Sequence, residues 1–104
     1  MILADIKTAL LTVTNNVYHF DATGAIGSYI VWSEDGQADS VWADGKMQNQ
    51  VITGTIDYYT KTEYDANFNA IQEALNEIGI SYRLNSIQYE TDTKYIHYEF
   101  VFEF

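Results

Sequence analysis

The chain contains no cysteine and no proline, and only five of its 104 residues are lysine or arginine. Without cysteine it can form no disulfide, no cysteine-ligated zinc or iron–sulfur site and no thiol nucleophile. These absences exclude a small secreted domain whose fold depends on disulfides, and nothing in the composition indicates an oxidising compartment.

Basic residues are scarce: the five Lys and Arg stand against fifteen Asp and Glu, so the net charge of the chain is −10. Affinity for nucleic acid comes largely from Lys and Arg that neutralise phosphates, so the composition disfavours binding to DNA or RNA. The same sign disfavours anionic lipid surfaces, and no apolar run approaches the ~20 residues of a membrane span. The opening segment MILADIKTALLTV has an acidic Asp5 and no small-residue cleavage site, which predicts mature structure rather than a signal peptide. We therefore expect a soluble, cytoplasmic product.

The length predicts a single domain over residues 1–104. Two segments have the apolar periodicity of a helix. The first carries a stripe of four residues and ends at Thr14-Asn15-Asn16; the stripe is Ile2, Ile6, Leu10 and Val13. The second spans residues 63–78, and its stripe is Tyr64, Phe68, Ile71, Leu75 and Ile78.

Sequence signals at both ends support the second helix. Thr62 with Asp65 three residues later resembles a capping box, which predicts the N-terminus. Gly79 stands where a left-handed residue commonly ends a helix.

The remaining segments alternate with period two and predict strands. Residues 28–34 form one strand that ends at Asp35-Gly36, and residues 47–61 form a longer one in which Gly54 indicates a bulge or a close backbone approach. Residues 80–90 and 94–104 flank a hairpin turn at 91–93, and residues 17–20 offer a possible extra short strand. The predicted fold class is α+β, with an antiparallel sheet of about four strands and two helices packed on one face, in the order α-β-β-α-β-β.

Catalytic signals are weak, and we predict no catalytic, cofactor or metal site. His19 and His97 lack the spacing of a metal pair. His97 lies near Glu99 on the outward side of the last strand. The two residues could form half of an acid–base pair, but the simpler interpretation is a surface histidine beside a carboxylate. No glycine-rich phosphate loop is present, since the glycines at 24 and 27 precede a strand.

Residues 34–45 carry four acidic side chains and a tryptophan: Glu34, Asp35, Asp39, Trp42 and Asp44. Their spacing does not match an EF-hand calcium loop. Trp42 either packs back on its own domain or anchors a partner surface. Long hairpin loops without regular structure are uncommon unless they function, so we take these residues as a candidate oligomer or lumen loop that orders on assembly.

The order of these segments resembles that of the small tail terminator, or tail-completion, proteins of long-tailed (siphovirus-type) bacteriophages and prophages. The resemblance rests on the leading helix, the strand YIVWSEDG, the acidic loop, the run ITGTIDYYTKTEYDANFNAIQEALN and the closing hairpin LNSIQYETDTKYIHYEFVFEF. It covers essentially the whole chain, although it is a pattern of element order and not a catalytic signature.

The resemblance implies a structural protein without enzymatic activity, located in the virion tail or neck and in the host cytoplasm during assembly. Such proteins form rings, typically hexamers, that cap the tail tube, end its polymerisation and join it to the head connector. Their subunit contacts generally involve sheet edges and the long hairpin loop. In that setting the carboxylates of residues 34–45 would face a lumen and repel the phosphates of passing DNA. Head–tail neck proteins resemble the chain in a similar way.

Two other classes remain open from the residues alone. A small acidic binding protein could mimic phosphate and inhibit a basic partner, and it would act as a monomer. A small enzyme using surface carboxylates is the third possibility.

Overall fold

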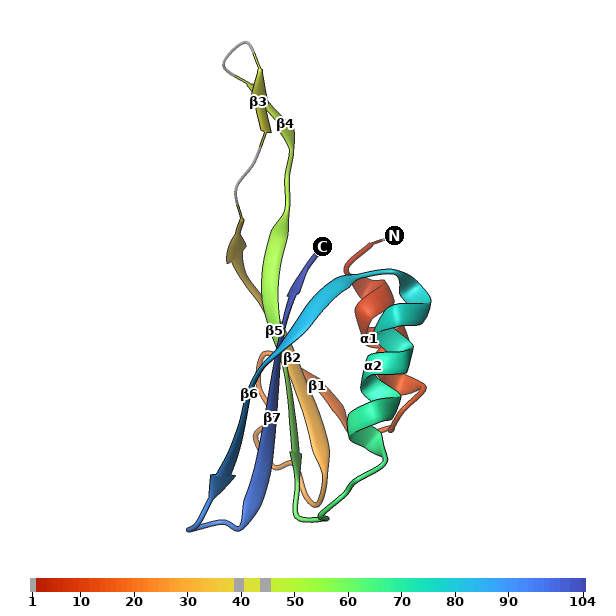
Figure 1. Cartoon of the computed structure of the whole chain (residues 1–104), viewed down its shortest axis with the longest axis vertical. Helices are drawn as coiled ribbons and strands as arrows, with labels where there is room; N and C mark the ends of the chain where they lie inside the picture. Colours follow the sequence, from red (N-terminus) through yellow and green to blue (C-terminus); the bar gives the residue numbers. More distant parts are fainter. Residues whose placement is uncertain (1, 39–40, 44–45) are drawn as a thin grey trace.

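The computed structural model describes residues 2–38, 41–43 and 46–104, and these form two helices and seven strands (Figure 1). In chain order the elements are α1 (Ala4–Leu11), β1 (Val17–His19), β2 (Tyr29–Gln37), β3 (Val41–Ala43), β4 (Lys46–Asn49), β5 (Ile52–Thr60), α2 (Asn67–Ile78), β6 (Ser81–Glu90) and β7 (Tyr95–Glu103). The fold is α+β, as the sequence predicts.

The main sheet has five strands in the order β1-β2-β5-β7-β6. The four strands β2, β5, β7 and β6 pair antiparallel, which matches the expected core of the sheet. β1 adds a fifth strand that runs parallel to β2, so the sheet is mixed and the wholly antiparallel prediction was wrong at this edge. Alternation along a strand marks its faces but carries no information on the direction of its neighbour.

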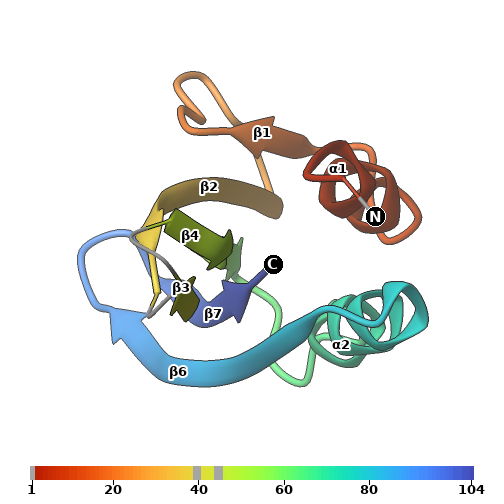
Figure 2. The ribbon, with the colours of Figure 1, turned by 90° about the horizontal axis from the view of Figure 1, so that it is seen from above.

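Both helices lie on one side of the curved sheet (Figure 2). We call the sheet face toward the helices the inner face and the opposite one the outer face. The core lies between the inner face and the helices, and its fully buried apolar residues are Ile6, Leu10, Ile30, Ile56, Tyr58, Ile71, Leu75 and Phe100. Tyr98, Phe100 and Phe102 of β7 are all buried, so alternate residues of the last strand face the core, in agreement with its period-two pattern.

The helices are shorter than their apolar stripes. α1 ends at Leu11, and Ile2 lies before the helix with 65% of its surface exposed. α2 begins at Asn67 and not at 63, because Tyr64 adopts a positive φ of 55° and is 99% exposed. Gly79 ends α2 in the left-handed conformation, as predicted.

Asp65, not Thr62, organises the start of α2. One carboxylate oxygen accepts the Asn67 backbone N–H at 2.9 Å, and the other accepts the hydroxyls of Tyr58 at 2.6 Å and Thr60 at 2.7 Å. Burial raises the pKa of Asp65, but these hydrogen bonds outweigh it and lower the pKa overall. The carboxylate therefore links the end of β5 to the beginning of α2.

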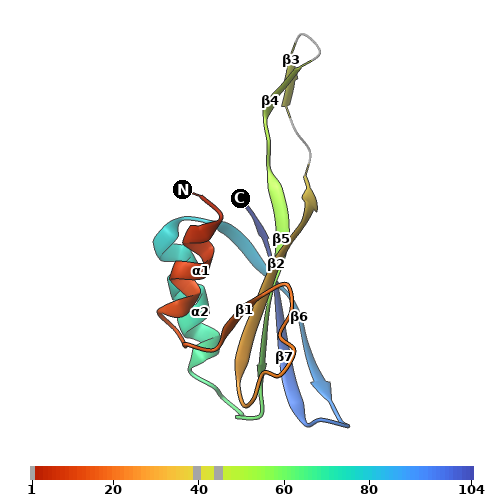
Figure 3. The ribbon, with the colours of Figure 1, turned by 180° about the vertical axis from the view of Figure 1, so that it is seen from behind.

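The strands β2 and β5 extend into an arm beyond the body of the molecule (Figures 1 and 3). Asp35-Gly36 does not end β2; the register shifts between Glu34 and Gly36, and pairing with β5 resumes through Gln37. Further out, β3 and β4 pair as a separate two-stranded ribbon, so the predicted strand 47–61 is divided into β4 and β5. The molecule measures 52 × 26 × 23 Å because of this projection.

Gly54 of β5 marks a close backbone approach, as the sequence predicts. A Cβ at this position would collide with the Phe102 ring and with the Ser33 carbonyl oxygen. The bulge itself lies on the facing strand β2, opposite Gly54 and Thr53.

Candidate functional site

Glu34 lies at the base of the arm and is held by a histidine. Its Oε1 is 2.8 Å from His19 Nε2, and the His19 ring stacks between Phe20 and Trp32 with centroid distances of 4.2 and 4.1 Å. β1 positions His19 here because it pairs parallel with β2 and brings His19 beside Trp32. The contact with His19 therefore holds the Glu34 side chain against the body of its own molecule.

Asp35 lies at the bulge of β2 and is exposed. Its carboxylate accepts a hydrogen bond from the Thr53 hydroxyl at 2.9 Å, across the arm on β5. Glu34 and Asp35 are adjacent, yet each has a separate partner. The structure therefore shows two individually bonded carboxylates at the base of the arm.

The structure describes less of the other three residues of the predicted loop site. Asp39 and Asp44 lie outside the described residues. The backbone of Trp42 belongs to β3 and faces Met47 of β4, so this part of residues 34–45 is a strand and not an irregular loop. The expectation that the segment orders on assembly stays a prediction.

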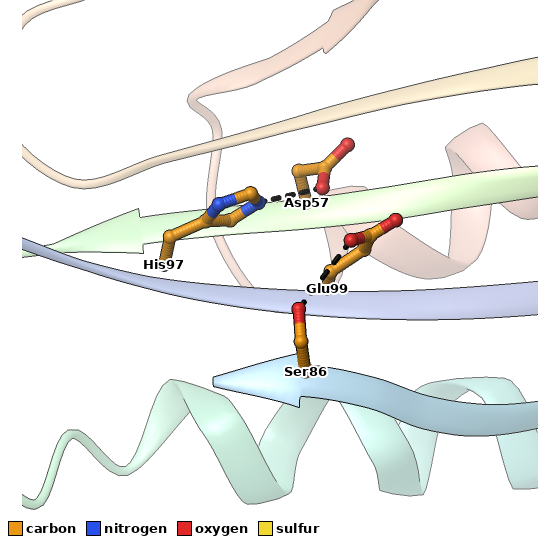
Figure 4. Close-up of polar contacts among 4 residues, drawn as sticks. All are labelled: Asp57, Ser86, His97 and Glu99. Atoms are coloured by element: carbon orange, nitrogen blue, oxygen red, sulfur yellow. Dashed lines mark hydrogen bonds and ion pairs between the residues drawn. The ribbon is translucent and has the colours of Figure 1, made fainter. Parts of the chain in front are cut away.

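A second polar group lies on the outer face, where His97 Nε2 is 2.7 Å from Asp57 Oδ1 (Figure 4). The hydrogen bond to Asp57 raises the pKa of His97; burial opposes this, and the nearby charges of Asp57, Glu90 and Glu99 add to it. The spacing along the last strand points to Glu99 as the neighbour of His97. The observed partner is Asp57 because the register places His97 opposite Tyr59, diagonal to Asp57.

Tyrosines surround this pair. Tyr59 stacks on His97 at a centroid distance of 4.3 Å and on Tyr29 at 4.9 Å, and Tyr95 packs edge-on against both tyrosines. Burial, together with the negative charge of Asp57, raises the pKa of Tyr59 to about 12. The Tyr95 hydroxyl donates to the Gly27 carbonyl at 3.0 Å, which holds the β1–β2 loop to this face.

Within the described residues, this arrangement does not pair a serine hydroxyl with His97 as its base. A serine nucleophile requires a hydrogen bond to the group that takes its proton. The Ser86 hydroxyl donates instead to Glu99 Oε2 at 3.4 Å (Figure 4). Within the described ranges, the side-chain hydrogen bond of His97 is with Asp57 alone. The Asp57–His97 pair thus has the geometry of a cross-strand link between β5 and β7.

Across the part of the chain that the structure describes, no group of three or more His, Asp or Glu side chains is arranged to hold a metal ion. In those same residues no helix is long and apolar enough to cross a membrane.

Comparison with known proteins adds no family. The chain matches no protein-family model, and no curated protein is similar to it in sequence.

Proposed function

We propose that this protein is a structural component of a long-tailed bacteriophage or prophage, a tail terminator that caps the tail tube as a ring. The observation that carries the proposal is the arm formed by β2, β5 and the β3–β4 ribbon (Figure 3). A two-stranded ribbon without a core of its own is marginally stable in water. An arm of this kind is best explained by an assembly in which neighbouring subunits cover it.

The element order supports the same proposal. A leading helix, a sheet with an arm, a second helix and a closing hairpin follow one another as the resemblance to tail terminators implies. In this proposal the ring is a hexamer, its partners are the tail tube protein and the head connector, and it resides in the virion after assembly in the host cytoplasm.

The charge of the chain fits a channel that conducts DNA. Asp35 is exposed at the base of the arm, and Asp39 and Asp44 follow in the sequence. Carboxylates that line a lumen repel the phosphates of DNA and let it slide. Glu34 contributes less to such a lining because it is paired with His19.

The decisive experiment is electron microscopy of the protein mixed with tubes assembled from the tail tube protein of the same phage. We expect capped tube ends and an end to further growth. Binding to the head connector without binding to tubes would assign the protein to the neck instead. A monomer that ignores both and binds a basic protein would support the acidic inhibitor class.

A charge reversal tests the lumen placement separately. A variant with Glu34, Asp35, Asp39 and Asp44 all changed to Lys should still give assembled particles, but with impaired DNA ejection. A control variant with the same change in charge replaces exposed acidic residues of the body: Glu63, Glu73, Glu77 and Asp92. Equal ejection by the two variants would reject the lumen placement and leave the capping role untouched.

A further inference from the structure

β6 forms one edge of the main sheet, and among the described residues no second strand pairs with its outward backbone groups. Within the described residues its only strand partner is β7. Its side chains are unusually exposed for a sheet, with 54% of Ile87, 61% of Tyr89 and 38% of Leu84 accessible. A long edge strand with exposed apolar residues is a template for pairing with another chain.

The two halves of β6 differ in how they are protected. The register with β7 shifts between Leu84 and Ser86, which places a bulge at Asn85, and Arg83 donates to the Asn85 side chain at 3.1 Å. Bulges and charged side chains are the usual means of blocking an edge. The second half, residues 86–90, pairs regularly with β7 and carries both of the more exposed apolar side chains.

We propose that residues 86–90 pair antiparallel with the same segment of a second copy, around a two-fold axis at Gln88. In this register Ile87 of each copy faces Tyr89 of the other, and Ser86 faces Glu90. Ile87 and Tyr89 both lie on the inner face, because they stand opposite Tyr98 and Ile96 of β7. The pairing therefore joins apolar side chains to apolar side chains and opposes no like charges.

Neighbouring registers fit less well. An axis at Ile87 would set Tyr89 against the bulged Asn85, and an axis at Tyr89 would set Ile87 against Thr91 in the turn. Since β6 loses its regular pairing at Asn85, the bulge also limits the contact to about five residues.

The inner face beside this segment offers room for the second copy. An open groove of about 550 Å³ lies between the start of α2 and the β6–β7 hairpin, with Tyr64, Phe68, Ile87 and Ile96 among its lining residues. Tyr64 is 99% exposed there. Tyr89 of the second copy would reach this groove and reduce the exposure of the apolar residues in it.

The contact is small and each copy carries −10, so the dimer is weak and is strengthened by salt. We expect it at protein concentrations on the order of 0.1 mM. The inference depends on β6 alone and holds whether or not the protein caps a tail tube.

Single cysteines test the register directly, since the chain has none of its own. With the axis at Gln88, the two Gln88 Cα atoms lie about 5 Å apart, within reach of a disulfide. The two Glu90 Cα atoms would be about 14 Å apart, too far for one. We expect Gln88→Cys to form a disulfide dimer about tenfold faster than Glu90→Cys. Equal rates, or faster cross-linking of Ile87→Cys or Tyr89→Cys, would overturn the register.

Solution mass tests the pairing independently of any cysteine. Sedimentation of the unmodified protein should show a monomer–dimer equilibrium that moves toward the dimer with added salt. Ile87→Lys should abolish the dimer, while Leu84→Lys, on the same strand and face but beyond the bulge, should preserve it. A mass that stays monomeric at on the order of 1 mM, or association that Ile87→Lys leaves unchanged, would refute the proposal.

Discussion

The two faces of β5 are stabilised in different ways. On the inner face, Gly54, Ile56, Tyr58 and Thr60 are all buried against the rest of the core. On the outer face, Asp57 and Tyr59 are only partly buried and contact their neighbours by a hydrogen bond or a ring stack. The inner face depends on close fit and on the hydrogen bonds of the buried Tyr58 and Thr60 hydroxyls, whereas water can replace much of what the outer face loses. A substitution on the inner face should therefore lower the free energy of unfolding more than a substitution of similar size on the outer face.

Gly54→Ala should produce the largest loss on the inner face. The added methyl group would collide with the Phe102 ring and with the Ser33 main chain, and the main chain cannot move without disturbing the β2–β5 pairing. We expect the free energy of unfolding, measured by urea denaturation, to fall by about 3 kcal/mol.

Gly36→Ala is the matched control for this change. Gly36 lies on the adjoining stretch of β2, and a Cβ there would meet only the Thr53 hydroxyl at 3.4 Å. It should cost less than about 1 kcal/mol. Similar losses for the two variants would show that strand propensity, and not the collision, determines the effect.

Asp65→Ala should produce the second largest loss. It removes the acceptor of the Tyr58 and Thr60 hydroxyls, in residues that are fully buried, and of the Asn67 N–H. We expect a loss of about 2 kcal/mol near neutral pH. Because the pKa of Asp65 is lowered in the folded protein, its contribution is present above the unfolded value of 3.8 and disappears as the pH falls through the folded value. The variant and the natural protein should therefore converge in acid.

Asp21→Ala serves as the control for Asp65→Ala. Asp21 also accepts a backbone N–H and a hydroxyl, both from Thr23, but in an exposed turn. Its removal should cost less than about 1 kcal/mol, because water takes over both hydrogen bonds. A loss equal to that of Asp65→Ala would contradict the role assigned to burial.

The inner face could be predicted from the sequence in most of its detail. Alternating apolar residues in β7 and the four-three spacing in α2 identify the buried side chains, since each pattern has the period of its own backbone. The close approach at Gly54 and the end of α2 at Gly79 were also predictable, because glycine has a specific conformational reason to stand at each.

The arm and the outer face could be predicted much less well. Asp35-Gly36 has the composition of a turn, yet here it forms a bulge because Thr53 and Gly54 on β5 continue the pairing. The Asp57–His97 contact depends on the register of β5 against β7, which local periodicity does not contain. The sequence indicates β1 only as a possible strand, because a segment of three residues is too short to show a clear period-two alternation.

His97→Phe should produce the smallest loss of the three, on the outer face. Phenylalanine keeps the stack on Tyr59 but removes the hydrogen bond to Asp57. Because the pKa of His97 is raised on folding, its contribution is fully present below the unfolded value of 6.5 and is lost as the pH rises through the folded value. The natural protein should exceed the variant in unfolding free energy by about 1 kcal/mol at about pH 5.5, and by progressively less toward about pH 9. A difference that stays constant over this range would mean that the hydrogen bond to Asp57 acts independently of the charge on His97, and no difference at any pH would mean that the ring stack, and not the ion pair, contributes the stability.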